Sequence, residues 1–162
     1  MNISIIKCDL KYLDACAEIL RGSELGMRYF ISKSKEYVGK ETLEEGFNKK
    51  EIYVALDENN NCVGFLWILI DGIFHCYPYL HVVAVKKELR GKGLGKQLMN
   101  FFEEMAFVED NSSKAFLVVG SFNTDAKKLY ERLGYVQVGE VPDLYVNGLT
   151  EFIMMKLRPR VG

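Results

Sequence analysis

One segment limits the possible folds more than any other: an apolar strand followed closely by a glycine-rich helix start. The apolar, β-branched run over 80–85 predicts a buried strand, and four residues separate it from the sequence RGKGLG at 90–95. Glycine has no Cβ, so alternating glycines let the backbone adopt positive φ and approach a ligand closely. The apolar spacing that follows predicts an amphipathic helix over 94–105. Backbone amides, a helix N-terminus and three nearby cations together predict a phosphate or pyrophosphate site.

Two better-known glycine motifs do not match this segment. A P-loop needs a serine or threonine after its lysine, and Gln97 follows Lys96 here. A dinucleotide-binding fingerprint needs glycines spaced G-x-G-x-x-G, whereas here the glycines occupy positions 91, 93 and 95. A glycine-rich helix start without any ligand is the simpler alternative, so the interpretation needs support from elsewhere in the chain.

A second segment gives that support, because it also follows a predicted short strand, at 115–119. Asn123 can cap a helix predicted over 124–133. Tyr130 lies seven residues after Asn123, about two turns, so the two share one helix face with Ala126. Capping and core packing explain each residue alone, but they do not explain why both segments occur in this order.

Composition limits the class of protein. With 162 residues, 49% of them hydrophobic, the chain is long and apolar enough to bury a core as a single domain over 1–162. A formal net charge of -1 argues against non-specific nucleic-acid binding. The longest uncharged run, Gly72–Val85, is too short for a membrane helix, and Lys7 and Asp9 interrupt any signal-peptide core. No two cysteines have C-x-x-C spacing, which disfavours a metal site and predicts free thiols in a cytoplasmic protein.

The remaining chain alternates predicted strands and helices without repeats or a linker. A helix is predicted between Asp9 and Gly22, and a second over 41–47 within an irregular polar stretch. Asp71-Gly72 predicts a hairpin turn. The predicted strands cover 2–7, 51–56, 62–70, a stretch that ends at 85, 115–119, 135–141 and 149–157. This order predicts a mixed sheet with helices on its faces.

In combination, the two segments resemble the signatures of the GCN5-related N-acetyltransferase (GNAT) superfamily. The run at 90–95 matches the R/Q-x-x-G-x-G/A signature without a gap. The stretch from Asn123 to Tyr135 matches the N-x-x-A-x-x-L-Y-x-x-x-G-[FY] signature, and the element order agrees over nearly the whole chain. The resemblance implies an α/β (α+β) fold with one mixed, mostly antiparallel, twisted sheet of about seven strands and about four helices. It also implies a splay between the central strands that end near Val85 and Val119.

The resemblance further implies acetyl-CoA as the acyl donor and a role for each matching residue. Backbone groups of Val83 and Val85 pair with the pantetheine arm, and the amides of 91–96 hold the pyrophosphate. Asn123 hydrogen-bonds the pantetheine or adjoining backbone, and Tyr130 lies near the thioester sulfur. The implied coenzyme-binding residues are Val83, Ala84, Val85, Arg90, Gly91, Lys92, Gly93, Leu94, Gly95, Lys96, Asn123, Ala126 and Tyr130.

Acetyl transfer to an amine makes three chemical demands. A lysine-like amine, with a pKa of about 10.4, is mostly protonated at neutral pH, so the site must remove a proton. The thioester oxygen gains charge, and the amide of Val83 is the expected hydrogen-bond donor to it. The leaving thiolate needs a proton, for which the phenol of Tyr130 is a workable acid. We therefore expect direct attack in a ternary complex, without a covalent enzyme intermediate and without a metal.

The general base is less defined by the sequence. Some relatives carry a glutamate at the position of Val118, and others at that of Tyr79, so both of these bases are absent here. Arylalkylamine acetyltransferases carry histidines at the positions of Tyr79 and His81, and His81 is retained. A pKa near 6.5 suits His81 to proton transfer. Tyr130 and His81 are therefore the catalytic candidates, with a structural histidine and a water chain as the alternative to the latter.

The family binds its acceptor between the segment after the first helix, here 23–40, and the last hairpin, here 142–150. Glu24 or Asp143 could attract a cationic amine, although ordinary solvated surface also explains both. The acceptor stays open between a small amine, an antibiotic, an amino acid and a peptide N-terminus. The residues also fit a non-catalytic acyl-CoA-binding module or, more remotely, a nucleotide-binding switch. We expect no nucleic-acid or membrane partner, and a homodimer is compatible because relatives are often dimers.

Overall fold

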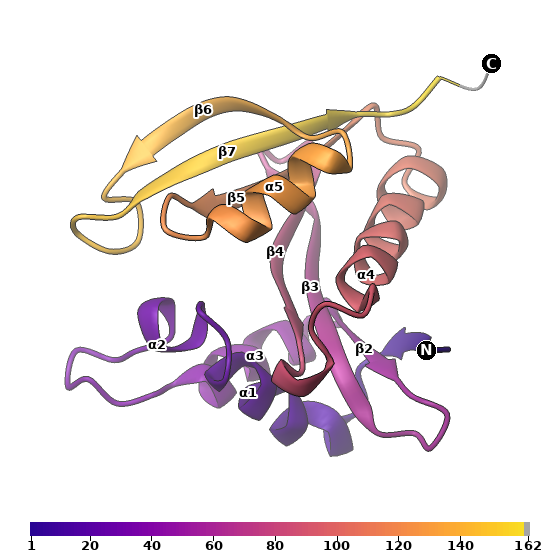
Figure 1. Cartoon of the computed structure of the whole chain (residues 1–162), viewed down its shortest axis with the longest axis vertical. Helices are drawn as coiled ribbons and strands as arrows, with labels where there is room; N and C mark the ends of the chain where they lie inside the picture. The colour runs from indigo at the N-terminus through magenta and orange to yellow at the C-terminus, as the bar shows by residue number, and fades with distance from the viewer. Residues whose placement is uncertain (161–162) are drawn as a thin grey trace. The chain divides into compact units, whose positions relative to one another are not determined.

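The computed structural model describes residues 1–160 and contains one sheet of seven strands within that range (Figure 1). The strand order is β1-β2-β3-β4-β5-β7-β6. The β4–β5 pairing is parallel, whereas β1–β2, β2–β3, β5–β7 and β6–β7 are antiparallel. The strands are β1 (Ser4–Lys7), β2 (Ile52–Leu56), β3 (Cys62–Ile73), β4 (Tyr77–Val85), β5 (Lys114–Gly120), β6 (Val136–Pro142) and β7 (Thr150–Leu157). The predicted mixed, mostly antiparallel sheet is confirmed.

Five α-helices lie within residues 1–160, one more than predicted. The addition is α2, a single turn that the sequence left within an irregular stretch. The helices are α1 (Leu13–Arg21), α2 (Gly26–Tyr29), α3 (Gly39–Asn48), α4 (Leu94–Glu103) and α5 (Thr124–Arg132). Two 3₁₀ turns, η1 (Leu10–Tyr12) and η2 (Lys87–Leu89), precede α1 and α4, and a π-helical turn, η3 (Glu104–Glu109), follows α4. Among residues 1–160, each helix is too short or too polar to cross a membrane.

The chain divides into two compact units. Met1–Ile68 and Val82–Phe102 make up the first, and Leu69–His81 with the chain from Glu103 onward make up the second. Strands β3 and β4 run from one unit into the other. The predicted splay concerns residues near Val85 in the first unit and residues near Val119 in the second, so it stays a prediction.

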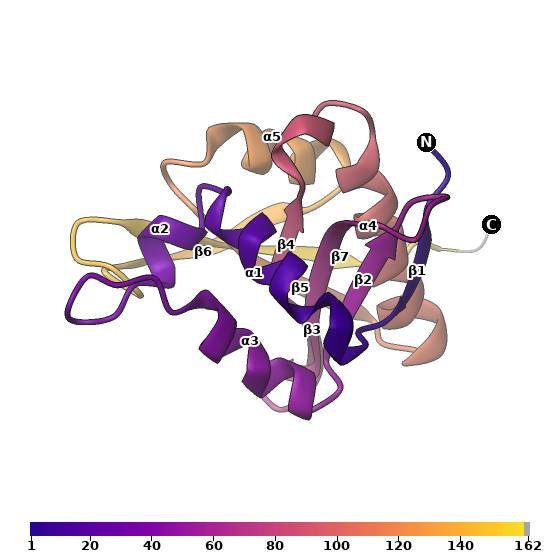
Figure 2. The ribbon, with the colours of Figure 1, turned by 90° about the horizontal axis from the view of Figure 1, so that it is seen from below.

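In the first unit, helix α1 forms because its apolar residues recur on one face. Leu13, Cys16, Ala17 and Leu20 are buried with spacings of three, one and three residues, as an amphipathic helix requires. Asp9 caps η1 rather than α1, since its carboxylate accepts a hydrogen bond from the N–H of Lys11. Helices α1 and α3 pack side by side (Figure 2).

Strand β3 is the central strand of the first unit. Its residues 62–68 are buried on both faces, which accounts for their nearly continuous apolar sequence. Strand β2 pairs with it in antiparallel register, with Ile52 opposite Trp67 and Ala55 opposite Gly64. The four cysteines are unbonded thiols, as predicted, and three of them are buried.

The hairpin predicted at Asp71-Gly72 is wrong, because β3 continues to Ile73. The turn lies at Phe74 and His75, both with positive φ (55° and 53°), and is closed by the N–H of Cys76 donating to the carbonyl of Ile73 at 3.1 Å. Gly72 has a different role. A Cβ there would lie 2.6 Å from Cβ of Leu69 and 2.7 Å from Cβ of Tyr79, so glycine permits a close approach.

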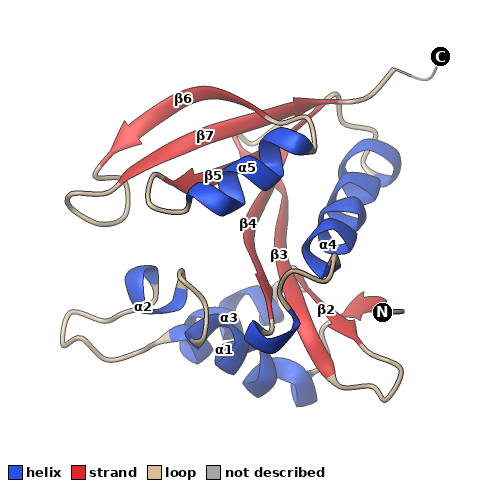
Figure 3. Ribbon diagram, viewed as in Figure 1, coloured by secondary structure: helices blue, strands red, loops and turns tan. Residues whose placement is uncertain are grey.

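The second unit is built on β5, β7 and β6, with α5 packed on β5 (Figure 3). Phe116 and Leu117 of β5 pair in parallel with Tyr79 and Leu80 of β4. The most buried side chains of this unit include Leu117, Tyr135 and Met154. Gly134, with φ of 98°, follows the end of α5 as the sequence predicted.

Candidate active site

The glycine-rich segment adopts the backbone that its sequence predicts. Gly91 and Gly93 have φ of 77° and 83°, a region that L-residues rarely occupy. A Cβ at either position would meet no atom within 4 Å, so the space beside this backbone is open. The glycines are therefore required by conformation, and they leave the peptide groups accessible.

Helix α4 begins directly after these glycines and leaves amides without helical acceptors. The N–H of Gln97 donates to the carbonyl of Gly93 at 3.2 Å, so the N–H groups of Leu94, Gly95 and Lys96 lie before this first helical bond. The side chain of Leu94 is buried, which leaves only its amide for a ligand. Lys92 and Lys96 are exposed cations beside them. Such a helix start favours an anion such as phosphate.

Arg90 connects this segment to the rest of the first unit. Its Nη2 donates to the carbonyl of Gly22 at 3.0 Å, and its Nε donates to the carbonyl of Val85 at 3.4 Å. The sequence predicted Arg90 as a positive charge near the glycines, and the resemblance implied that it binds the coenzyme. The structure adds that its guanidinium links the glycine segment by hydrogen bonds to the C-cap residue of α1 and to the last residue of β4.

Strand β4 presents two chemically different faces. Tyr79, His81, Val83 and Val85 are half-buried, whereas the alternate residues, including Ala84, are buried. These alternate positions therefore share one face of the strand. Ala84 can contribute to a ligand only through its backbone.

His81 is held as a neutral imidazole. Burial lowers its pKa below the ordinary value of 6.5, so the neutral form of the ring is favoured at neutral pH. Its ring centroid lies 5.9 Å from that of Tyr79, its neighbour on the same face. A neutral histidine is the form that a general base requires.

The hydroxyl of Tyr79 meets that of Tyr145 at 3.4 Å, a contact that sequence reasoning missed. The sequence marks Tyr79 only as a position where relatives carry a base. Burial, the neighbouring Tyr145 and the charge of Glu151 raise the pKa of Tyr79, so its phenol stays protonated. Glu151 itself is a carboxylate that is only 2% exposed.

Helix α5 places the second set of predicted residues. Asn123 occupies the N-cap position, but its side chain makes no capping hydrogen bond, which corrects the simpler interpretation of this residue. Its backbone N–H instead donates to the carbonyl of Gly120 at 2.9 Å, and its carbonyl accepts from the N–H of Lys127 at 3.1 Å. The amide side chain of Asn123 is thus not used to cap the helix.

Tyr130 is buried, with only 8% of its surface exposed. Burial raises the pKa of its phenol to about 12. Its ring packs edge-on against that of Tyr135, with centroids 6.1 Å apart. The hydroxyl of Tyr135 donates to Oε2 of Glu103 at 3.3 Å, and Lys156 pairs with Oε1 of Glu103 at 2.6 Å. A polar network therefore holds the ring against which Tyr130 packs.

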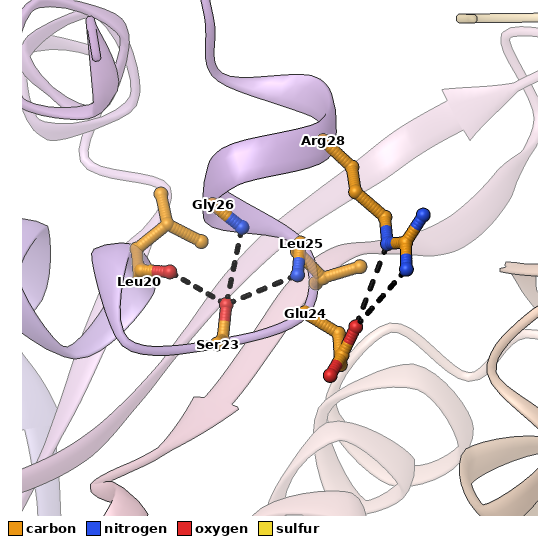
Figure 4. A network of polar contacts seen from close by, with 6 residues as sticks. All are labelled: Leu20, Ser23, Glu24, Leu25, Gly26 and Arg28. Atoms are coloured by element: carbon orange, nitrogen blue, oxygen red, sulfur yellow. Dashed lines mark hydrogen bonds and ion pairs between the residues drawn. The ribbon is translucent and has the colours of Figure 1, made fainter.

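The segment predicted to contact the acceptor begins with a compact turn (Figure 4). The hydroxyl of Ser23 donates to the carbonyl of Leu20 at 2.6 Å and accepts from the N–H groups of Leu25 and Gly26, each at 3.2 Å. Glu24 pairs with Arg28 at 3.5 Å on the surface. Its charge is therefore offset locally, which weakens Glu24 as an attractor for an amine.

Asp143 has a structural partner as well. Its Oδ1 accepts a hydrogen bond from the N–H of Gly148 at 2.7 Å, and this bond stabilises the loop between β6 and β7.

Among residues 1–160, no group of three or more His, Cys, Asp and Glu side chains is placed to hold a metal ion. The structure thus brings residues 83–96 together in the first unit, and His81, Asn123, Ala126 and Tyr130 belong to the second.

Comparisons with known proteins agree with the fold. The model of the acetyltransferase (GNAT) domain family matches residues 21–158. A prophage-derived uncharacterized N-acetyltransferase, YokL, from Bacillus subtilis (strain 168) is 30% identical over 63% of this chain and 58% of its own length. Spermidine N(1)-acetyltransferase from Vibrio cholerae is 28% identical over 69% of this chain and 68% of its own. The matches therefore cover between 49% and 68% of these and further curated relatives.

Solved structures show the same architecture over the full chain. Ard1 from Thermoplasma volcanium superimposes with a TM-score of 0.81, at 18% identity, and the match covers 99% of this chain and 100% of that one. An identity this low establishes a shared fold alone.

Proposed function

This chain belongs to the acetyltransferase (GNAT) family, and we propose that it moves the acetyl group of acetyl-CoA to a primary amine. The observation that carries the proposal is the backbone at Gly91 and Gly93, where two positive-φ glycines lead into the first amides of α4. This arrangement suits a diphosphate, which acetyl-CoA contains. The family match runs through both units, which supports one catalytic domain over the whole chain.

The coenzyme-binding role falls to the residues that match the family signatures. The amides of 91–96 bind the pyrophosphate, and Arg90, Lys92 and Lys96 add positive charge. Backbone groups of Val83–Val85 pair with the pantetheine arm. The side chain of Asn123, which makes no capping hydrogen bond, hydrogen-bonds the pantetheine arm beside Ala126. Support comes from the half-buried face of β4 and from the absence of a capping bond at Asn123.

The reaction is a direct displacement at the thioester that acetyl-CoA supplies. His81, neutral because it is buried, accepts the proton that the ammonium of the acceptor must lose. The amine nitrogen then forms a bond to the carbonyl carbon while the carbon–sulfur bond breaks. The amide of Val83 stabilises the carbonyl oxygen as it gains charge. The phenol of Tyr130 donates a hydrogen bond to the departing sulfur, the thiolate takes its proton from solvent, and the nitrogen loses its second proton to solvent.

The acceptor is an amine of a small molecule or a peptide. One curated relative is named as a spermidine acetyltransferase, which supports a small cationic amine as a first candidate. We infer a cytoplasmic location from the four unbonded thiols, since disulfides are rare in that compartment. A homodimer is proposed because relatives in the family are often dimers. The site residues named above all come from a single chain, so the proposed reaction does not require a second copy.

The test is thiol release from acetyl-CoA across a panel of primary amines, with coenzyme binding followed in parallel by calorimetry. We expect acetyl-CoA to bind and at least one amine to accelerate thiol release. Gly93→Ala should weaken coenzyme binding, while Gly148→Ala, a positive-φ glycine in an equally open position, is the matched control. Tight binding without release by any amine would contradict catalysis, and absence of acetyl-CoA binding would contradict the proposal altogether.

A further inference from the structure

Arg90 makes hydrogen bonds to peptide carbonyls of two other segments. Its Nη2 donates to the carbonyl of Gly22 at 3.0 Å, and its Nε donates to the carbonyl of Val85 at 3.4 Å. Gly22 is the C-cap residue of α1, 68 positions earlier in the chain, and Val85 is the last residue of β4. All three residues belong to the first unit. The guanidinium therefore joins three segments of that unit to one another.

The bond to Gly22 is favoured by its position at the C-terminal end of α1. The last carbonyl groups of an α-helix lack the helical N–H donors that earlier carbonyls have, and they carry the negative end of the helix dipole. A cationic donor is stabilised there, and its hydrogen bond is stronger than one between neutral groups. The end of α1 and the backbone just before Gly91 are therefore linked by a charge-assisted hydrogen bond.

The chain after Gly22 is a compact turn whose order depends on contacts outside it (Figure 4). It includes α2 (Gly26–Tyr29), a single helical turn whose N-cap residue makes no side-chain capping bond. A helix this short is not stable by itself. The hydroxyl of Ser23 accepts from two backbone N–H groups of the turn, each at 3.2 Å, and donates to the carbonyl of Leu20 at 2.6 Å. The turn is thus anchored on the same end of α1 that Arg90 holds.

The segment that follows Arg90 becomes fixed when its amides bind an anion. Gly91 and Gly93 have φ of 77° and 83°, and a Cβ at either position would meet no atom within 4 Å. Glycine has the greatest backbone freedom of all residues, so this loop loses much of its freedom when successive amides bind one ligand. Because Arg90 directly precedes Gly91, its backbone is fixed together with these amides.

We propose that Arg90 is a positioning residue that couples coenzyme binding in the glycine segment to the order of the turn at 22–30. The pyrophosphate fixes the backbone at 91–96, and the guanidinium of Arg90 then holds the end of α1 and the turn anchored on it. The inference rests on the proposed function, since it requires the amides of 91–96 to bind the coenzyme. It gives Arg90 a role beyond the positive charge that it shares with Lys92 and Lys96.

The coupling has two consequences. Residues 23–40 are the segment expected to contact the acceptor, so the coenzyme orders part of that segment before the acceptor binds. Coupling between two sites is also reciprocal. A change that loosens the turn must therefore weaken coenzyme binding, and it does so only while Arg90 links the two.

The first experiment follows hydrogen exchange of backbone amides with and without CoA, at a concentration that saturates each variant. In wild type, CoA should slow exchange at 94–96, and it should also slow exchange at 25–30 by at least about fivefold. In Arg90→Met, CoA should still slow exchange at 94–96 but should leave 25–30 unchanged. Lys92→Met is the matched control, because it removes one exposed positive charge from the same segment, and it should retain the effect at 25–30.

The second experiment measures the affinity for CoA by calorimetry in Ser23→Ala. Loss of the hydroxyl should lower the affinity about two- to tenfold, although Ser23 lies outside both coenzyme signatures, because the hydrogen bonds of the turn are lost. In the Arg90→Met background, the same substitution should cause no further loss. Circular dichroism checks that each variant is folded.

The outcomes separate this inference from the proposed function. The coupling role is wrong if CoA slows exchange at 94–96 but not at 25–30 in wild type, or if the effect at 25–30 persists in Arg90→Met. It is also wrong if Ser23→Ala changes the affinity for CoA equally in both backgrounds. The proposed function stands in each of these cases. If the turn is coupled through Arg90 but no amine releases thiol from acetyl-CoA, catalysis fails while the role of Arg90 stands, and absence of CoA binding would overturn both.

Discussion

Replacing Lys156 with methionine should destabilise the protein strongly, although the change removes a single ion pair. Nζ of Lys156 lies 2.6 Å from Oε1 of Glu103, and the two side chains are only 18% and 15% exposed. The hydroxyl of Tyr135 donates to the other carboxylate oxygen. Methionine keeps most of the apolar stem of lysine, so the loss comes mainly from leaving the Glu103 carboxylate without its cation.

The magnitude follows from burial. Removing one partner of a buried ion pair costs about 3–5 kcal/mol, and the remaining exposure of this pair lowers the expected loss to about 2–4 kcal/mol. For a chain of this size, that loss corresponds to a fall in Tm of about 5–15 °C. Urea unfolding followed by circular dichroism measures the free energy, and an unchanged slope would show that the native state stays compact.

The matched control is Lys40→Met. Nζ of Lys40 lies 2.7 Å from Oδ1 of Asp14, nearly the same separation, but these side chains are 50% and 78% exposed. Water screens the exposed pair, so no measurable loss is expected. Adding Glu103→Gln to Lys156→Met should restore part of the stability, because no buried charge then lacks a partner. Equal losses of stability in Lys156→Met and Lys40→Met would refute the reasoning, because the distance between the charges, and not their burial, would then determine the loss.

Three further predictions concern the proposed site and the core. The acidic limb of the kcat/KM pH profile should have its midpoint below 6.5, because burial lowers the pKa of His81 and only the neutral ring accepts a proton; a limb retained in His81→Ala would exclude this base. Gly93→Ala and Gly148→Ala should each cost about 1 kcal/mol by urea unfolding, because both glycines have positive φ, but calorimetry should show weaker acetyl-CoA binding only for the former. Gly46→Ala should cost about 1–3 kcal/mol by urea unfolding, since its Cβ would lie 2.5 Å from Cε2 of Trp67; an unchanged midpoint would show that the indole shifts freely.

The hairpin between β3 and β4 shows where local sequence rules stop. Asp71-Gly72 is a favourable turn pair, yet the strand continues through it, and the turn uses Phe74 and His75 instead. Glycine at 72 is required by the close approach of Tyr79, a residue on the partner strand. A glycine needed for packing and a glycine needed for a turn look alike in one sequence, so the position of this turn could not be predicted from it.

In the candidate site too, local sequence patterns predicted some features, whereas contacts between residues far apart in the chain could not be predicted. The conformation of Gly91 and Gly93 was predictable, because local chain geometry alone requires glycine there. The helical position of Tyr130 followed from a seven-residue spacing. The contact between Tyr79 and Tyr145 joins residues 66 apart through the sheet and a loop, and no local pattern reports it. Helix α2 was missed for a related reason, since it is a single turn whose Gly26 packs against the backbone of Leu20.

Burial of Tyr130 changes what its phenol can do for the reaction. Its pKa of about 12 lies about 3.5 pH units above that of a thiol, so complete proton transfer to the thiolate would be uphill by about 5 kcal/mol. A hydrogen bond from the phenol to the sulfur needs no such transfer, and it stabilises the charge as it forms. Tyr130→Phe should therefore lower kcat about 10–100-fold with little change in the affinity for acetyl-CoA. Because the phenol stays protonated, the alkaline side of the kcat pH profile should be the same in the wild type and in Tyr130→Phe. An alkaline limb near pH 9 that disappears in Tyr130→Phe would show instead that the phenol ionises there and acts as a full acid.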